Sequence, residues 1–260
     1  MQPEIDLLGL PLKTFGLFFG LAFVVSGLMV GRRLKERGHP PDWAYEMVFA
    51  ALVGGIVGAR GYWLGTHADQ VSGDVLGSVF GGSGLVWYGG LAGGAAGVLL
   101  WAWRKGMFNL ELLGICAPAL AMGYAVGRIG CQVSGDGDYG KATDLPWGMA
   151  YPNGIVPTTE VVHPTPIYET LAMGLGAWLL WRARDAFRPG VLFVFYLVLV
   201  GGERFLVEFV RRNEPVVAGL TEAQVISLLT LLGGTVWLVL AARSGGLRAT
   251  PTVPARAATT

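Results

Sequence analysis

Apolar and polar residues alternate in long blocks along this chain. Seven stretches carry few charges, and each is about long enough to cross a hydrocarbon core of roughly 30 Å as a helix. We expect these helices at Leu12–Gly31, Trp43–Leu64, Leu85–Trp103, Leu110–Val126, Ile167–Trp181, Val191–Phe209 and Ala223–Ala242. Polar segments separate them, so the pattern predicts an all-α membrane bundle of about seven transmembrane helices.

The composition agrees with a membrane protein. Hydrophobic residues make up 53% and charged residues 14% of the 260 residues, against roughly 25% charged residues in soluble domains. The net charge of +1 predicts no nucleic-acid partner, because such a partner requires a basic stripe. The acidic start of the chain, with Glu4 and Asp6, lacks the basic region of a cleavable signal peptide.

The basic residues of the connections predict the orientation. Twelve Lys and Arg residues fall in segments 32–42, 104–109 and 182–189 and in the tail after residue 242, while about five fall in the alternate segments. Cytoplasmic loops carry the excess of Lys and Arg. We therefore expect the N-terminus outside the cytoplasm and the C-terminus inside it.

The longest polar connection, residues 128–165, is rich in Gly, Asp and Pro and also holds aromatic residues. Because long connections in compact proteins are either functional or disordered, we expect a small ordered extracytoplasmic cap here. Residues 1–245 are predicted to form one transmembrane catalytic domain that includes this cap. Residues 246–260 are predicted to be a flexible cytoplasmic tail.

Three arginines, Arg60, Arg128 and Arg204, lie within or at the ends of apolar stretches. An Arg at the bilayer centre costs about 2.5–3.5 kcal/mol on insertion scales, so it normally faces a polar cavity and has a partner. Arg204 and Glu208 are four residues apart and share one helix face. They form either an ion pair that fixes packing or an anion site in which Glu208 orients Arg204. Arg suits phosphate because its planar fork donates two parallel hydrogen bonds.

The sequence GRIGCQVSGDGDYG, residues 127–140, carries Arg128 from a helix end into a Gly-rich loop with Ser134 and Asp136. Glycines allow close backbone approach, and successive N–H groups can form an anion-binding nest. The alternation of Asp136 and Asp138 with glycine has a faint likeness to a calcium loop, although the twelve-residue ligand pattern is absent. A simple turn is the other alternative.

Two further segments contain polar groups at helix starts. HPTPIYE, residues 163–169, opens the fifth stretch with His163, Tyr168 and Glu169. Its prolines suit a helix start, where a missing N–H costs little, and its His is either structural or part of a site. Tyr88 precedes a pair of glycines at the start of the third stretch, as an interfacial anchor or as a site residue.

Familiar catalytic motifs do not occur in the sequence: there is no Ser-His-Asp order, HExxH, P-loop or CxxC pair. Cys116 and Cys131 lack the spacing of a disulfide framework. We therefore expect no cofactor and no metal. The site is expected to work by clamping an anion and positioning the reactants.

Together and in this order, these segments resemble the bacterial prolipoprotein diacylglyceryl transferases. GRIGCQVSGDGDYG resembles that family's signature, and VGARGYW, WYGGL, HPTPIYE, ERFLVEFVRR and TEAQVIS resemble its other conserved blocks, over roughly residues 10–245. The resemblance implies transfer of the diacylglyceryl group of phosphatidylglycerol to the lipobox cysteine thiol of preprolipoproteins, with glycerol 1-phosphate as the leaving group. This reaction is the first step of bacterial lipoprotein maturation, at the cytoplasmic (inner) membrane and among its lipids.

By this resemblance, Arg128 and Arg204 are the two essential arginines that face the phosphate of the lipid. Tyr88 occupies a position where the family often has a catalytic His. The residues expected to bind the substrates are Arg60, Glu208, Ser134, Asp136, His163, Tyr168 and Glu169.

The chain departs from the family at Tyr88 and at Phe15, near which the family's first helix often carries Tyr. Asn in some members corresponds to Cys131. A Tyr has a reference pKa near 10, so Tyr88 would be a poor general base at neutral pH. His163, Asp136 and Asp138 are candidate replacements for the proton acceptor.

The departures leave two alternatives open beside the transferase. The chain could be a related membrane enzyme that uses another phospholipid or another thiol acceptor. It could also be a phospholipid-binding or transport protein whose arginines bind headgroups without turnover. The sequence shows no internal repeat of the kind common in transporters.

Overall fold

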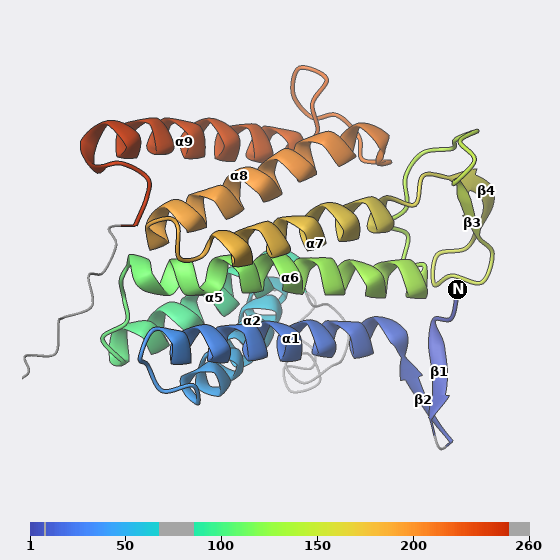
Figure 1. The fold of residues 1–260 in the computed structure, drawn as a ribbon. Helices are drawn as coiled ribbons and strands as arrows, with labels where there is room; N and C mark the ends of the chain where they lie inside the picture. Colours follow the sequence, from blue (N-terminus) through green and yellow to red (C-terminus); the bar gives the residue numbers. More distant parts are fainter. Residues whose placement is uncertain (8, 68–85, 250–260) are drawn as a thin grey trace, which may run out of the picture. The chain divides into compact units, whose positions relative to one another are not determined.

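The structure, a computed structural model, describes residues 1–7, 9–67 and 86–249 (Figure 1). Its helices are α1 (Thr14–Glu36), α2 (Trp43–Thr66), α5 (Trp87–Arg104), α6 (Leu110–Ser134), α7 (Thr165–Ala183), α8 (Pro189–Val207), the 3-10 helix η1 (Glu208–Val210) and α9 (Glu222–Gly245). Its strands are β1 (Glu4–Leu7), β2 (Leu10–Lys13), β3 (Met149–Tyr151) and β4 (Thr158–Val162). Among these residues, each predicted apolar stretch overlaps one α-helix, which confirms the all-α fold class.

Most of the described helices, though not α5 and α7, meet the length and hydropathy expected of membrane spans. Five segments among the described residues are long and apolar enough to cross a bilayer, namely α1, α2, α6, Pro189–Val210 and α9. Large apolar side chains on several helices are mostly exposed, including Leu28, Phe49, Val57, Leu171 and Leu229. Soluble proteins rarely expose so much apolar surface to water. The chain is therefore an integral membrane protein.

The chain divides into two compact units: unit 1, Met1–Ser26 with Leu113–Thr260, and unit 2, Gly27–Leu112. In unit 2, helices α2 and α5 pack through glycines. A Cβ atom on Gly93 would lie 2.2 Å from the carbonyl oxygen of Gly54 and 2.7 Å from the Cα of Gly58. The two backbones are therefore in direct contact, as small residues allow in membrane helices.

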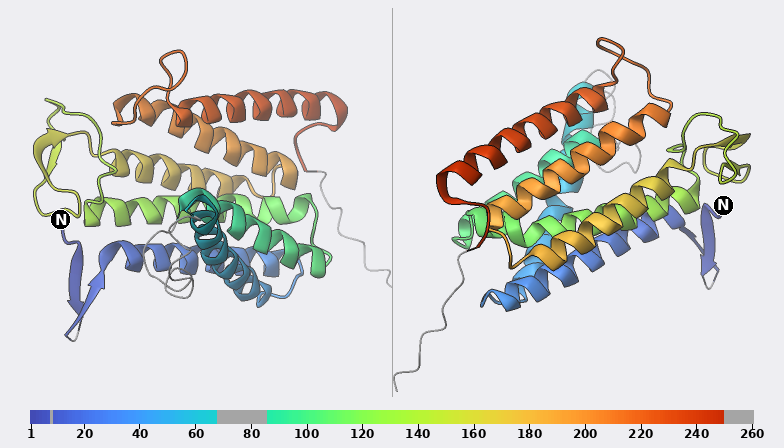
Figure 2. Two further views of the ribbon diagram at one scale, coloured as in Figure 1. Left: turned by 180° about the vertical axis from the view of Figure 1, so that it is seen from behind. Right: turned by 45° about the horizontal axis from the view of Figure 1, so that its top comes forward.

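In unit 1, α7 lies between α6 and α8, and α9 packs on α8 (Figures 1 and 2). The apolar core joins the first three of these helices through small and medium side chains. Its buried members are Ala117, Ala121, Ala125, Met173, Ala177, Leu180 and Leu192. Because consecutive helices run in opposite directions, α6 ends, α7 begins and α8 ends at the same end of the unit.

A cap covers that end of unit 1, between α6 and α7. Strands β3 and β4 pair antiparallel, and the buried side chains of Tyr139, Tyr151 and Val162 form a small core beneath them. The rings of Tyr139 and Tyr151 stack with their centroids 4.7 Å apart. Burial raises the pKa of Tyr151 to about 12, so its hydroxyl stays protonated and donates to Gln132.

The end of α6 differs from the sequence prediction. The helix runs on to Ser134, so the cap begins later than residue 128 and Arg128 lies inside the helix. Gly130 does not make a turn; it lets α6 approach α1, since a Cβ there would lie 2.8 Å from the Cβ of Phe18. The helix ends where Gly135 takes a φ of +61°, a conformation that glycine adopts without strain.

The first helix also begins slightly later than predicted. Leu12 and Lys13 belong to β2, which pairs antiparallel with β1, and α1 begins at Thr14. Two predicted segments lie partly outside the described residues. They are the third apolar stretch, at its first residue Leu85, and the tail, from residue 250 on.

Candidate active site

The end of unit 1 beneath the cap gathers charged side chains from three helices. Arg128 lies two turns before the end of α6, Glu169 in the second turn of α7, and Arg204 in the last turn of α8. Glu208 and Arg211 follow on η1 and directly after it. The antiparallel packing of the three helices therefore brings residues far apart in the sequence into one cluster.

Glu169 lies at the centre of this cluster. Its side chain is fully buried, and it contacts three guanidinium groups: Nε of Arg128 at 2.8 Å, Nη1 of Arg204 at 3.2 Å and Nη1 of Arg211 at 3.4 Å. A buried carboxylate requires paired charges and hydrogen bonds. Glu169 thus orients three arginines at once.

Glu208 is the second fully buried carboxylate. Its Oε2 lies 3.2 Å from Nη2 of Arg204, the predicted i,i+4 pair, and 3.7 Å from Nε of Arg211. Its Oε1 accepts hydrogen bonds from Asn213 Nδ2 at 2.5 Å and Thr221 Oγ1 at 2.9 Å. Because Thr221 also caps α9, Glu208 ties the cluster to the start of that helix.

Asp138 joins the cluster from the cap. It pairs with Arg128 through Oδ2 and with Nη2 of Arg211 at 2.6 Å through Oδ1. Burial by itself would raise the pKa of the Asp138 carboxyl, but the charges of Arg128 and Arg211 outweigh burial and hold that pKa below its ordinary value. Asp138 is therefore an anion at neutral pH and anchors the cap to the helix ends.

Three arginines and the three carboxylates paired with them balance in charge, but they are not equally accessible. The side chains of Glu169 and Glu208 are 0% exposed, whereas that of Arg204 is 24% exposed. Each guanidinium carries five N–H donors, more than its carboxylate partners use. The cluster can therefore offer oriented N–H groups to an anion, with Arg204 the most open of the three.

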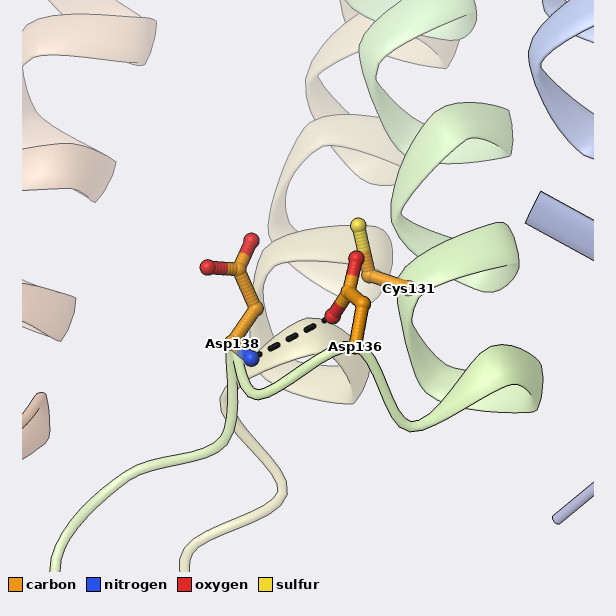
Figure 3. Close-up of side chains that lie close together, drawn as sticks. All are labelled: Cys131, Asp136 and Asp138. Carbon is orange, nitrogen blue, oxygen red and sulfur yellow. Dashed lines mark hydrogen bonds between the residues drawn. The ribbon is translucent and has the colours of Figure 1, made fainter. Parts of the chain in front are cut away.

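A cation fits this site less well. Ligand atoms of Cys131, Asp136 and Asp138 lie within 4.8 Å of one another (Figure 3), and Asp136 accepts a hydrogen bond from the N–H of Asp138. However, Asp138 already pairs with two arginines, and Nη1 of Arg128 lies 3.7 Å from the Sγ of Cys131. A metal ion would meet these positive charges, so we assign no metal to this group.

The other predicted residues of unit 1 lie around the cluster. Ser134 is buried and donates to the carbonyl of Cys131 at the end of α6. His163 contacts the Tyr168 hydroxyl at 3.3 Å, and that hydroxyl accepts from Trp147 at 2.8 Å. Within the described residues, these three predicted side chains make no hydrogen bond to the clustered arginines. Their predicted role in substrate binding stays a prediction.

Arg60 and Tyr88 belong to unit 2. The buried guanidinium of Arg60 lies over the ring of Trp63, 4.6 Å from its centroid. Tyr88 is 51% exposed in the first turn of α5. Their roles in substrate binding and catalysis remain predictions.

The structure adds two residues to the cluster that the sequence did not single out as site residues. Arg211 contacts all three of the paired carboxylates. In the sequence, its spacing of three from Glu208 already puts it within reach of that carboxylate, but the spacing does not report its contacts with Asp138 and Glu169. Tyr124, one turn before Arg128, contacts Glu169 and Glu203 through its hydroxyl.

Comparison with known proteins gives consistent results. Residues 4–240 match the family model described as prolipoprotein diacylglyceryl transferase. A phosphatidylglycerol–prolipoprotein diacylglyceryl transferase of Clostridium tetani is 32% identical over 90% of this chain and 95% of its own length. The protein of that name from Chromohalobacter salexigens is 33% identical over 82% of each chain.

Proposed function

The chain belongs to the prolipoprotein diacylglyceryl transferase family, and from this membership we propose how its clustered residues act. It is a transferase that moves the diacylglyceryl group from phosphatidylglycerol to prolipoproteins, the first step of lipoprotein maturation. We propose that the acceptor is the thiol of the lipobox cysteine and that glycerol 1-phosphate leaves. The enzyme acts in the bacterial cytoplasmic membrane, among its lipids.

We propose that Arg128 and Arg204 bind the phosphate of the lipid. The observation that carries this proposal is the convergence of Arg128, Arg204 and Arg211 on the buried Glu169. Negative charge grows on the phosphate as the bond between carbon and oxygen breaks. Donors held in place before the reaction stabilise such developing charge without reorganising.

The carboxylates have a positioning role in this proposal. Arg204 directs Nη1 to Glu169 and Nη2 to Glu208, and each of these nitrogens carries a second hydrogen. Fixed guanidinium planes hold the lipid in one orientation, so the thiol approaches the reacting carbon from a defined direction. Such positioning contributes strongly to rate. Asp136, Ser134, His163, Tyr168 and Arg60 are proposed to contact the substrates.

The proposed orientation puts this site at the extracytoplasmic end of unit 1. Arg182 in the last turn of α7, with Arg184 and Arg188 in the connection to α8, lies at the end opposite the cluster. Basic connections favour the cytoplasmic side. The N-terminus is then extracytoplasmic and the C-terminus cytoplasmic.

The test is a transfer assay with the purified full-length protein, phosphatidylglycerol in mixed micelles and a lipobox peptide. We expect the peptide to gain the mass of one diacylglyceryl group while an equal amount of glycerol phosphate is released. A peptide with Ser in place of the lipobox Cys is the control and should not react. Binding of the lipid without release of glycerol phosphate would overturn the proposal in favour of a phospholipid-binding protein.

The same assay addresses the other alternative. Phosphatidylethanolamine replaces phosphatidylglycerol in a parallel reaction, and a small-molecule thiol replaces the peptide in another. Faster turnover with either replacement would favour a related enzyme with another lipid or acceptor. We expect the pair of phosphatidylglycerol and lipobox peptide to be the fastest.

A further inference from the structure

The hydroxyl of Tyr124 lies between two carboxyl groups. Its oxygen is 3.3 Å from Oε1 of Glu169 on α7 and 3.4 Å from Oε2 of Glu203 on α8. Nη2 of Arg128, one turn further along α6, donates to the same oxygen at 3.5 Å. One hydroxyl therefore links the central carboxylate of the cluster to Glu203, which the proposed phosphate clamp does not use.

The number of hydrogens limits how these contacts can form. A phenol has one hydrogen to donate and two lone pairs that accept. If both carboxyl groups were ionised, only one of them could receive the hydrogen, and the other would place an anionic oxygen against the phenolic oxygen. Both contacts are attractive when one carboxyl group carries a proton and donates it to Tyr124. The hydroxyl then accepts from Arg128 and from that carboxyl group, and donates to the other.

The surroundings decide which group carries the proton. Glu169 contacts three guanidinium groups. Within the described residues, Glu203 has no guanidinium nitrogen within ion-pair distance, and its buried Oε1 has no hydrogen-bond partner. Burying the carbonyl oxygen of a neutral carboxylic acid without a hydrogen bond costs less free energy than burying a carboxylate oxygen without one. Glu169 is therefore the anion, and the proton belongs to Glu203.

We propose that Glu203, Tyr124 and Glu169 form a proton relay for the transfer reaction, in which Glu203 holds a proton before the substrates react. The proposal rests on the proposed function. The relay would take the place of the general base that the family's His is expected to provide at the position of Tyr88. Glu203 acts through the Tyr124 hydroxyl, so it is a positioning residue.

The relay balances the protons of the reaction. The sulfur loses its proton as its electron pair forms the bond to carbon, and the bond between carbon and phosphate oxygen breaks. That oxygen leaves with the bonding pair. The relay gives one proton to the phosphate oxygen and takes one from the thiol, so it ends in its starting state. The charged and titratable groups that face Glu203 in the described residues are Tyr124 and Arg128 of α6, Glu169 of α7 and Arg204 of α8.

The first experiment tests the proton without requiring turnover. Infrared difference spectra of the full-length protein in phosphatidylglycerol vesicles, without peptide, compare the wild type with Glu203→Gln. We expect the wild type to show the C=O stretch of a protonated carboxylic acid and Glu203→Gln to lack it. Glu214→Gln, the same change on an exposed connection, should keep the band. A spectrum in which Glu203→Gln removes no such band would overturn the proposal, whether or not the protein is a transferase.

The second experiment tests the use of the proton. In the transfer assay, Glu203→Gln and Tyr124→Phe should each lower kcat by about 10²-fold, the lower range for proton-transfer catalysis, with the KM for phosphatidylglycerol unchanged. Both should shift the pH profile of kcat in the same way, the double variant should be no slower than either, and Glu203→Asp should restore part of the rate. The relay would be contradicted if the variants kept the wild-type kcat and pH profile. It would also be contradicted if their kcat fell by the same factor at every pH.

Discussion

Replacement of Glu169 with Gln tests whether one carboxylate holds the arginine cluster together. The two oxygens of Glu169 divide the arginines: Oε2 faces Arg128 at 2.8 Å, and Oε1 faces Arg204 at 3.2 Å and Arg211 at 3.4 Å. A Gln amide keeps one oxygen and puts N–H donors in place of the other. Each guanidinium keeps a second carboxylate partner, Asp138 or Glu208, but the cluster then carries one positive charge that no carboxylate balances.

The side chain of Glu169 is 0% exposed, so water cannot replace the lost acceptor. Removal of one partner from a buried ion pair costs about 3–5 kcal/mol, and we expect Glu169→Gln to lower the free energy of unfolding by that amount. The assay is an SDS titration of the purified protein in mixed micelles, monitored by circular dichroism.

Glu160→Gln is the matched control. Glu160 also pairs with an arginine, Arg212 at 3.2 Å, but its side chain is 67% exposed. Exposed pairs contribute at most about 1 kcal/mol, so this variant should unfold close to the wild type. Equal costs for the two variants would refute the reasoning that Glu169 organises a buried cluster.

Two further predictions concern unit 2 and the cap. Gly93→Ala should disrupt unit 2, since its Cβ would lie 2.2 Å from a carbonyl oxygen of α2. Gly61→Ala should leave the SDS midpoint nearly unchanged, because no atom of the described residues beyond its own helix lies within 4 Å of its Cβ. Equal midpoints for the two variants would contradict the glycine contact. The pKa of Asp138 is lower in the folded state than its unfolded-state pKa of about 4. Its carboxylate therefore contributes to stability above about pH 4, and this contribution is lost as the pH falls through the folded-state pKa. The difference in Tm between the wild type and Asp138→Asn should therefore be largest at neutral pH and shrink as the pH falls below about 4, and a constant difference would argue against the ion pairs.

The sequence predicted the helices well because their signal is local. Apolar stretches of membrane length produced one helix each, and the spacing of four residues predicted the pair of Arg204 and Glu208, which contact at 3.2 Å. The convergence of Arg128 and Arg204 on Glu169 could not be predicted in this way. It depends on how three helices pack, and no sequence spacing reports that.

The glycines show why the end of α6 was predicted too early. Gly130 and Gly135 both look like turn residues in a Gly-rich segment. Only Gly135 has a positive φ, while Gly130 is helical and makes room for Phe18. The two uses of glycine become distinct only when the neighbouring helix is in place.

Arg211 and Tyr124 were not predicted as site residues, for opposite reasons. Arg211 follows the sixth stretch and counted among the basic residues of a connection. Tyr124 lies in an apolar stretch, where an aromatic side chain is ordinarily part of the packing. The carboxylates that give each residue its role come from other helices.

The central claim is that Arg128 and Arg204 bind the phosphate of phosphatidylglycerol during transfer. The most direct measurement is kcat/KM for phosphatidylglycerol in the transfer assay, with Arg128→Ala, Arg204→Ala and the control Arg32→Ala, whose side chain is 69% exposed. All three variants should insert into membranes in normal amounts. We expect the first two to lose turnover and Arg32→Ala to retain it. A near-normal kcat/KM in Arg128→Ala or Arg204→Ala would remove that arginine from the phosphate clamp.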